Sequence, residues 1–365
     1  MSNRKVYADI KLIEPGMVLA EDVYNLEGVL LIPQGFKLNE ASLNKIPDLG
    51  IQRIWVYDDN VVGITESQFE NMKKLKDVQT PLKKEVSNSC KLSYASTKDF
   101  VKDALVGFTE GKSLNVEKVS ETSQNLLYEF NNNLDIIRVL NTFRGYDDYT
   151  YTHSINVALL SSMMAKWLYL SVEEIKDLTT AGMLHDIGKA KLPHELLNKP
   201  ATLTDEEYEK IKQHSMLGYR AVETLGNMNQ NIKMGILMHH ERIDGSGYPL
   251  KAKSDQIPLF ARIIAICDVF DAMTSETVYR RKTFPFKVFK ELEQEAMGKL
   301  DIELVYLFLK NMANFYVGEV VELSTGEYGE IVFINPTCIY KPIVKVDNTF
   351  IDLMLESGTS IVGFI

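Results

Sequence analysis

The apolar segment INVALLSSMMAKWLYL, residues 155–170, restricts the fold of this chain more than any other feature. It is too short to span a bilayer, and it carries Lys166 together with several small polar residues. We therefore predict a buried core helix here. Apolar residues recur at helical spacing from about residue 126 to residue 315, so this helix belongs to a predominantly helical region.

Two further helices in this region have recognisable start signals. Ser171 with Glu174, and Thr204 with Glu207, have the spacing of a capping box, in which each side chain accepts a hydrogen bond from the other residue's backbone N–H. We predict one helix from Ser171 to the histidine at its end. We predict another that continues from Thr204 to about residue 226.

The chain divides into four segments of different character, and the fold class is mainly α. Residues 1–60 alternate apolar and polar positions between turn signals, which predicts a small β-rich module. Residues 61–125 are polar and predict a mostly helical linker. Residues 126–315 form the helical domain. Residues 316–365 predict a C-terminal β segment with a hairpin turn at Thr325-Gly326-Glu327.

Composition and charge exclude several classes of function. The chain is 45% hydrophobic and 25% charged, as expected for a globular protein. Its net charge of −10 argues against binding a nucleic-acid polymer, which requires a basic surface. The N-terminus has no apolar secretory segment. The three cysteines are an odd number without metal-type spacing, so we expect a reducing, cytoplasmic compartment.

Five of the six histidines lie on or beside apolar helical segments, where an unpaired polar group would be costly. The sixth, His194, is expected on the surface. On the helix that begins after Pro258, Asp268 and Asp271 are three residues apart and share one face. The five histidines are His153, His185, His214, His239 and His240.

Each of these histidines has an ordinary structural interpretation when it is taken alone. A single histidine on an apolar face is usually a hydrogen-bonded core residue, His185-Asp186 can be a simple pair, and His239-His240 can end a helix. As a set, however, they match a mixed imidazole–carboxylate metal site. Without a cysteine ligand, iron or manganese is preferred over structural zinc.

Two divalent ions are expected, because the ligand set is larger than one open metal centre needs. Asp186 can bridge two ions, which would lie about 3.5–4 Å apart, the arrangement used to split phosphate esters. Such ions convert a bridging water to hydroxide, polarise the phosphoryl group and stabilise the leaving oxygen.

The ordered motifs HDIGK (residues 185–189) and HHERIDGSGYP (residues 239–249) resemble the HD-GYP subgroup of the HD phosphohydrolase superfamily. The resemblance covers about residues 126–315 and implies an HD-type helical bundle that hydrolyses cyclic di-GMP or a related cyclic dinucleotide. It implies metal ligation by His153, His185, Asp186, His214, His239, His240 and Asp268.

The resemblance also implies roles next to the metals. Asp186 would bridge the ions, and Lys189 would stabilise the charge of the scissile phosphate. Substrate contacts would come from Gly247, Tyr248 and Arg280, in addition to Lys189. A solvated helix-end lysine is the alternative for Lys189. Asp271 either orients a ligand histidine or pairs locally, and the sequence does not separate these alternatives.

Two positions depart from the family pattern. Tyr149 stands where members with three metals carry a glutamate, which favours two metals here. Thr277 stands where many members carry a phosphate-binding arginine, so phosphate binding would rest on Arg280, with Arg281 and Lys282 beside it. We expect a phosphodiesterase that produces linear pGpG, and the sequence leaves open whether pGpG or GMP is the end product.

A cyclic-dinucleotide receptor with little turnover, an enzyme for another cyclic dinucleotide, and a mononucleotide phosphohydrolase are the alternatives to this function. The flanking β segments leave sensing, docking to a signalling partner and homodimerisation open. Structural covering of the helical core is the default for both segments.

Overall fold

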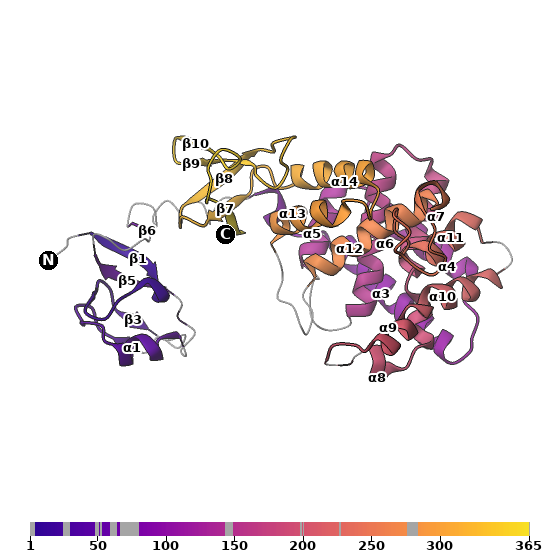
Figure 1. The fold of residues 1–365 in the computed structure, drawn as a ribbon, viewed down its shortest axis with the longest axis horizontal. Coiled ribbons are helices and arrows are strands. Elements are labelled where there is room, and N and C mark those ends of the chain that lie inside the picture. Colours follow the sequence, from indigo (N-terminus) through magenta and orange to yellow (C-terminus); the bar gives the residue numbers. More distant parts are fainter. Residues whose placement is uncertain are drawn as a thin grey trace. The chain divides into compact units, whose positions relative to one another are not determined.

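The computed structural model describes residues 4–24, 30–47, 51, 53–58, 64–65, 80–142, 149–197, 199, 201–225, 228–275 and 284–364. The backbone forms two compact units, one of residues 1–80 with 316–365 and the other of residues 81–315 (Figure 1). The division into four segments, with boundaries after residues 60, 125 and 315, was predicted from the sequence and stays a prediction.

In the residues that the structure describes, the first unit contains three β-sheets, and its strands are short. Its N-terminal part has a four-stranded sheet of order β2-β5-β1-β6 and a β3-β4 pair, and its C-terminal part has a five-stranded sheet of order β10-β9-β8-β7-β11. The elements are β1 (Lys5–Asp9), η1 (Ile10–Leu12), β2 (Val18–Leu19), β3 (Val23–Tyr24), β4 (Leu30–Ile32), α1 (Glu40–Lys45), β5 (Arg53–Tyr57), β6 (Ile64–Thr65), β7 (Val320–Leu323), β8 (Tyr328–Phe333), β9 (Ile343–Val346), β10 (Thr349–Asp352) and β11 (Ile361–Phe364).

The predicted hairpin in the C-terminal segment is confirmed. β7 and β8 pair antiparallel on either side of residues 325–327. Gly326 has a φ of 84°, a conformation that glycine adopts without strain.

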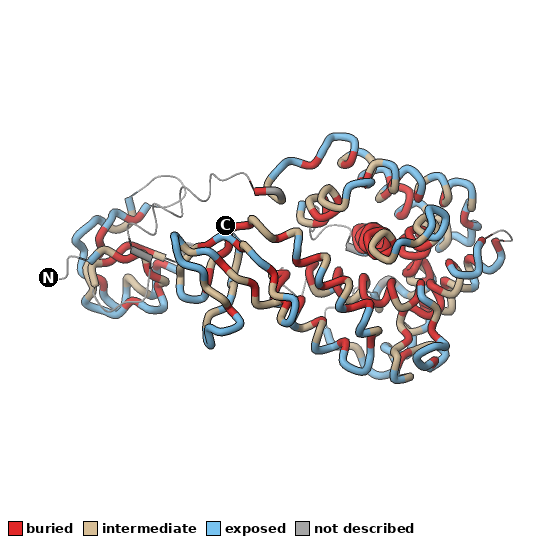
Figure 2. Tube along the Cα trace, turned by 90° about the horizontal axis from the view of Figure 1, so that it is seen from above, coloured by how far each residue is buried: buried red, intermediate tan, exposed pale blue. Residues whose placement is uncertain are grey.

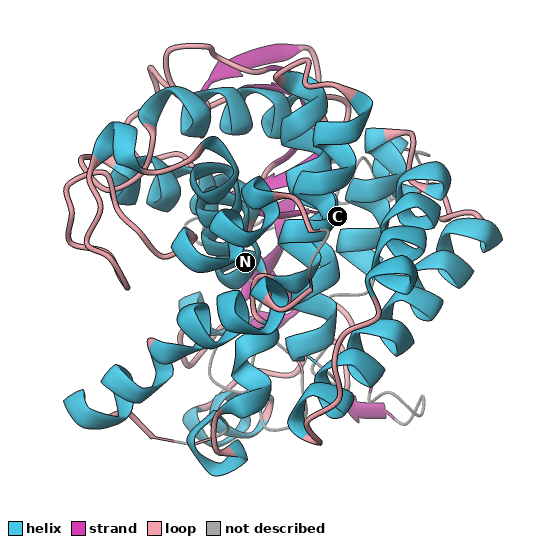
Figure 3. Ribbon diagram, turned by 90° about the vertical axis from the view of Figure 1, so that its right-hand side faces the viewer, coloured by secondary structure: helices cyan, strands magenta, loops and turns pink. Residues whose placement is uncertain are grey.

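The second unit is helical, and buried residues concentrate inside it (Figure 2). Helices make up most of the part that faces the viewer in Figure 3. Its elements are η3 (Pro81–Lys83), α3 (Asn88–Thr109), α4 (Val116–Glu129), α5 (Asn133–Thr142), α6 (Tyr149–Trp167), α7 (Val172–Leu184), η4 (Ile187–Lys191), α8 (His194–Leu197), α9 (Asp205–Ile211), α10 (Gln213–Glu223), α11 (Gln230–Met238), η5 (Ser254–Gln256), α12 (Leu259–Thr274), α13 (Pro285–Ala296) and α14 (Ile302–Asn314).

The helix predicted from the apolar segment is α6, and it is a core helix as expected. Every residue from Thr152 to Ala165 is buried. Contacts with α7 and α12 cover it, and α3 and α5 pack on it as well. Within the described residues, no helix is long and apolar enough to cross a membrane.

Both predicted capping boxes are present. Glu174 N–H donates to Ser171 Oγ at 3.2 Å, and Ser171 N–H donates back to Glu174 Oε2 at 2.9 Å. The matching distances for Thr204 and Glu207 are 3.3 and 2.8 Å. These bonds satisfy backbone donors that the first turn of a helix leaves unpaired.

The prediction of a single helix from Thr204 is wrong in one respect. The segment is divided at Lys212 into two helices, α9 and α10. The backbone N–H of Lys212 donates to the carbonyls of Tyr208 and Lys210, which tightens the last turn of α9. The new start places His214 in the first turn of α10, facing η4.

Candidate metal centre

The predicted ligands lie together in one buried cluster of the helical unit. They come from α6, from the residues that end α7 and α11, from the first turn of α10, and from α12. His153 Nε2 lies 3.1 Å from Asp268 Oδ1 and 3.8 Å from Asp186 Oδ2. At the other side of the cluster, His240 Nδ1 lies 3.9 Å from Asp268 Oδ2.

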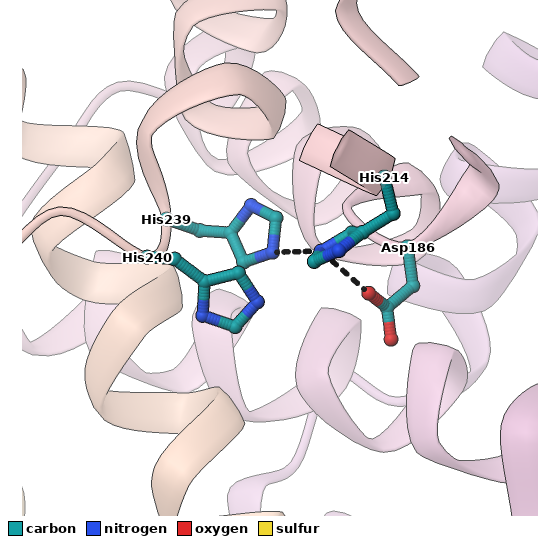
Figure 4. Close-up of side chains that lie close together, drawn as sticks. All are labelled: Asp186, His214, His239 and His240. Atoms are coloured by element: carbon teal, nitrogen blue, oxygen red, sulfur yellow. Dashed lines mark hydrogen bonds and ion pairs between the residues drawn. The ribbon is translucent and has the colours of Figure 1, made fainter. Parts of the chain in front are cut away.

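Asp186 belongs to two groups of residues that could hold a metal ion. In each group, the candidate ligand atoms all lie within 4.8 Å of one another. Asp186 Oδ1 is 3.4 Å from His214 Nε2, and its Oδ2 is 3.3 Å from His185 Nε2. Figure 4 shows His214 between His239 and this carboxylate. A carboxylate shared in this way can contact two ions. The two groups are Asp186 with His214, His239 and His240, and Asp186 with His153 and His185.

Backbone carbonyls orient three of the imidazoles in the same way. The Nδ1–H groups of His185, His214 and His239 donate to the carbonyl three residues earlier, at 2.8, 2.7 and 2.8 Å. Each ring lies at the start or end of a helix, where carbonyls remain available. This bond fixes the proton on Nδ1, so Nε2 presents a lone pair to the cluster.

Several atoms in the cluster lack the partner that a buried polar atom needs. Nε2 of His214 lies 3.3 Å from Nε2 of His239, although neither of these neutral rings has a proton there to donate. Among the described residues, His185 Nε2 and Asp186 Oδ1 have no hydrogen-bond partner. Facing lone pairs and orphaned acceptors are unfavourable unless a cation lies between them. The donor set therefore fits a divalent metal.

The protonation of the imidazoles suits metal binding. Burial lowers the pKa of His214, and it lowers the pKa values of His239 and His240 well below the usual histidine value. These rings are therefore neutral near pH 7, the form of histidine that binds metals.

The carboxylates of the cluster are ionised despite their surroundings. Burial would raise the pKa of Asp186, but His185 and Lys189 hold it well below its usual range. In Asp268, burial is likewise outweighed by the hydrogen bond with His153, which keeps the pKa low. The cluster thus combines neutral nitrogen donors at His214, His239 and His240 with anionic oxygen donors at Asp186 and Asp268, a set suited to iron or manganese.

His153 differs from the other rings because a carboxylate holds its Nδ1. That atom lies 2.8 Å from Asp271 Oδ2, and the second oxygen of Asp271 accepts from Asn156 Nδ2 at 2.9 Å. Tyr94 on α3 in turn donates to Asn156 Oδ1 at 2.8 Å. Of the two roles left open for Asp271, the structure supports orientation of a ligand histidine.

Lys189 lies on η4, and its ammonium group donates to Asp186 Oδ2. Its side chain is 29% exposed, whereas Asp186 is 2% exposed. Burial would lower the lysine pKa, but the charge of Asp186 raises it, so Lys189 stays protonated. A positive charge thus stands where the cluster opens to solvent. The alternative of a solvated helix-end lysine does not fit this contact.

The glycine-rich loop folds back on the double histidine. The ring of Tyr248 stacks on His240, with centroids 4.7 Å apart, and its backbone N–H donates to the His240 carbonyl. A Cβ on Gly247 would lie 2.4 Å from Glu241 Cα and Arg242 N, so only glycine fits there. The Tyr248-Pro249 peptide bond is cis. Gly247 therefore has a packing role, and its contact with substrate stays a prediction.

Glu241 is a residue of the site that the sequence analysis did not single out. It is 2% exposed, and its two carboxylate oxygens accept from the backbone N–H groups of Leu250 and Ala252 at 2.6 and 3.0 Å. The carboxylate of Glu241 therefore fixes the end of the glycine-rich loop, at Leu250 and Ala252, next to the double histidine. Its position directly after His239-His240 was the sequence signal that could have identified it as a residue of the site.

Some predicted residues lie outside the described part of the chain. Arg280, Thr277, Arg281 and Lys282 fall between residues 276 and 283, and the side chain of Tyr149 is also outside it. Their roles in binding phosphate or metal stay predictions.

Comparisons with known proteins agree on the family. Residues 135–304 match the HD domain family. Cyclic di-GMP phosphodiesterase PA4108 of Pseudomonas aeruginosa is 29% identical over 325 residues, which cover 86% of this chain and 77% of that protein. 3′3′-cGAMP-specific phosphodiesterase 1 of Vibrio cholerae is 36% identical over 196 residues, covering 51% of this chain and 43% of that protein.

The solved structure of Bd1817, an HDG"Y"P protein from Bdellovibrio bacteriovorus, supports the fold. It aligns with a TM-score of 0.52 and 16% identity, covering 84% of this chain and 99% of that one. Fold and site together define a helical domain built around an imidazole–carboxylate cluster that could hold metal. Residues 135–304 resemble the HD domain family, and residues 247–249 within them have the Gly-Tyr-Pro sequence of the HD-GYP subgroup.

Proposed function

We propose that this protein is a metal-dependent phosphodiesterase that hydrolyses cyclic di-GMP to linear pGpG with two iron or manganese ions, with GMP as the alternative end product. The observation that carries the proposal is the position of Asp186. It is shared by two groups of metal-ligand atoms and bonded to Lys189, whose charge faces the opening of the cluster.

The residues of the chain have distinct roles in this proposal. His153, His185, His214, His239, His240 and Asp268 hold the ions, and Asp186 bridges them. When bound, the ions supply an activated water and neutralise phosphate charge. Lys189 lies next to the bridging carboxylate, and we assign to it the stabilisation of charge on the phosphate oxygens. Asp271 keeps the ring of His153 in place.

The proposed substrate is a cyclic dinucleotide, because named relatives act on compounds of this class. Cyclic di-GMP is the first choice, since the match to the Pseudomonas enzyme extends over most of this chain. The match to the Vibrio enzyme makes 3′3′-cGAMP the second candidate. Tyr248, Gly247 and Arg280 are the proposed substrate contacts, and Thr277 in place of the family arginine is expected to weaken phosphate binding.

The test is hydrolysis by the full-length protein, purified without oxygen and loaded with Mn²⁺ or Fe²⁺. We expect cyclic di-GMP to be opened, while Asp186→Asn abolishes the reaction and Asp103→Asn, on the exposed face of α3, leaves it unchanged. Faster turnover of 3′3′-cGAMP would reassign the substrate. Binding without turnover of any cyclic dinucleotide, in protein shown to contain metal, would favour a receptor and reject the enzyme.

Metal number, compartment and assembly belong to the same proposal. Elemental analysis should find two ions per chain. The three cysteines are unpaired, which suits the reducing cytoplasm that we propose. Homodimerisation or docking of a signalling protein through the β segments is tested by light scattering with and without cyclic di-GMP.

A further inference from the structure

A second concavity of the helical unit is separate from the metal centre. It has a volume of about 730 Å³ and lies between the end of α3, the residues that follow η4, and one face of α9 and α10. None of the proposed metal ligands lines it. Its size falls within the range of small-molecule sites, about 300–1,000 Å³.

Among the described residues, the charged side chains that line this pocket are all cationic. Lys191, Lys210 and Arg220 reach it from η4, α9 and α10, and among the described residues none of them has a carboxylate partner. A fourth cation, Lys112, pairs with Glu110 at 2.6 Å. Three cations without a carboxylate partner among the described residues thus line one concavity, in a chain of net charge −10. They provide a local site for an anion.

The rest of the lining is suited to a flat organic group. Phe108, Leu114 and Leu217 form apolar wall, while Gln213 and Thr224 offer hydrogen bonds. The ammonium group of Lys191 lies 4.6 Å from the centre of the Phe108 ring, a cation–π contact that keeps its charge at the pocket wall. An anionic group next to an apolar aromatic wall matches the two parts of a nucleotide, phosphate and base.

We propose that this pocket binds a nucleotide, with phosphate on Lys191, Lys210 and Arg220 and the base against Phe108 and Leu217. Guanidinium and ammonium groups form charge-assisted bonds to phosphate, and the arginine can bind two oxygens at once. The proposal does not depend on the reaction catalysed at the metal centre.

The pocket has a direct structural connection to that centre. A Cβ on Gly188 would lie 1.9 Å from the His214 carbonyl oxygen, so the backbones of η4 and α10 are in close contact. The same two elements carry pocket residues and centre residues, since Lys189 and Lys191 share η4 and His214 and Arg220 share α10. A ligand in the pocket therefore touches both elements that place Lys189 and His214.

The experiment titrates full-length, metal-loaded protein with GMP, guanosine and inorganic phosphate by calorimetry. GMP should bind more tightly than either of its parts. Arg220→Gln should weaken GMP and phosphate binding about tenfold or more, the effect of a lost charge-assisted bond. Phe108→Ala should weaken GMP binding and leave phosphate binding unchanged. Lys310→Gln, an exposed position on α14, is the matched control.

Because GMP can also reach the metal centre, the site is located by photo-crosslinking with 8-azido-GMP. Crosslinks to residues 108–114 or 213–224 are expected, and Arg220→Gln should remove them. Crosslinks confined to residues 239–248 would overturn the proposal. Equal affinity for GMP and phosphate, with no effect of Phe108→Ala, would also overturn it and leave a simple anion site.

Discussion

Asp271 Oδ2 lies 2.8 Å from Nδ1 of His153, and this carboxylate takes the place of the backbone carbonyl that orients other ligand histidines. The contact joins residues 118 positions apart. Burial would lower the pKa of His153, but Asp268 and Asp271 together raise it to about 10. If His153 held a metal ion through Nε2, the ring would first have to lose this firmly held proton.

Replacing Asp271 tests this orientation. Asp271→Asn replaces the carboxylate with a neutral amide, so the His153 ring loses its anionic partner at Nδ1 and keeps Asp268 at Nε2. We expect metal affinity to fall about 10–100-fold, the range for partners that orient metal ligands. Competition with a chelator measures it. Asp99→Asn, exposed on α3, is the control, and unchanged metal retention in Asp271→Asn would contradict the role.

Lys189 is expected to act on turnover without holding metal. Lys189→Met should lower kcat for a cyclic dinucleotide about 10²–10³-fold, the effect of losing one charge-stabilising donor, while metal content stays constant. Lys310→Met is the control. Loss of metal in parallel with activity would instead make Lys189 a structural partner of Asp186.

Glu241 is expected to hold the glycine-rich loop in position. In Glu241→Gln, an amide NH₂ group replaces one of the two carboxylate oxygens. One of the two loop N–H groups then faces a donor and loses its acceptor, which costs about 1–3 kcal/mol of folding free energy. Thermal unfolding measures this loss, and limited proteolysis between residues 245 and 251 measures loop opening. Glu295→Gln, exposed on α13, should change neither. Wild-type resistance of the loop would contradict the assignment.

The three thiols should differ in reactivity. Burial raises the pKa of Cys267 to about 12, so at pH 8 it remains a protonated thiol, and the reactive thiolate appears only as pH approaches that value. Cys90 is also buried, whereas Cys338 is partly exposed. In native protein at pH 8, Ellman's reagent should label Cys338 rapidly and the others only after unfolding. Rapid labelling in Cys338→Ser would contradict this.

The sequence predicted the helices and ligands whose signals are local. The capping boxes, the buried α6 and the hairpin at residues 325–327 all depend on neighbouring residues, and all are present. The ligand histidines could be predicted as a set because an imidazole on an apolar helix face needs a partner.

Other features could not be read from the sequence because they depend on distant contacts. The division at Lys212 follows from how α10 packs against η4, where Gly188 meets the His214 carbonyl. The chain of hydrogen bonds from Tyr94 through Asn156 to Asp271 joins three helices. No spacing rule connects such residues, and the polar segment before residue 126 gave no sign that α3 would reach the site.

The burial of α6 from Thr152 to Ala165 has a consequence for the order in which the protein is made. Its surface is covered in part by α12, which ends at Thr274, so more than a hundred residues must follow before the cover is available. During synthesis the apolar helix is exposed to other chains, the condition under which incomplete proteins associate wrongly. The contacts of His153 with Asp268 and Asp271 also need α12, so they form only after this helix has left the ribosome.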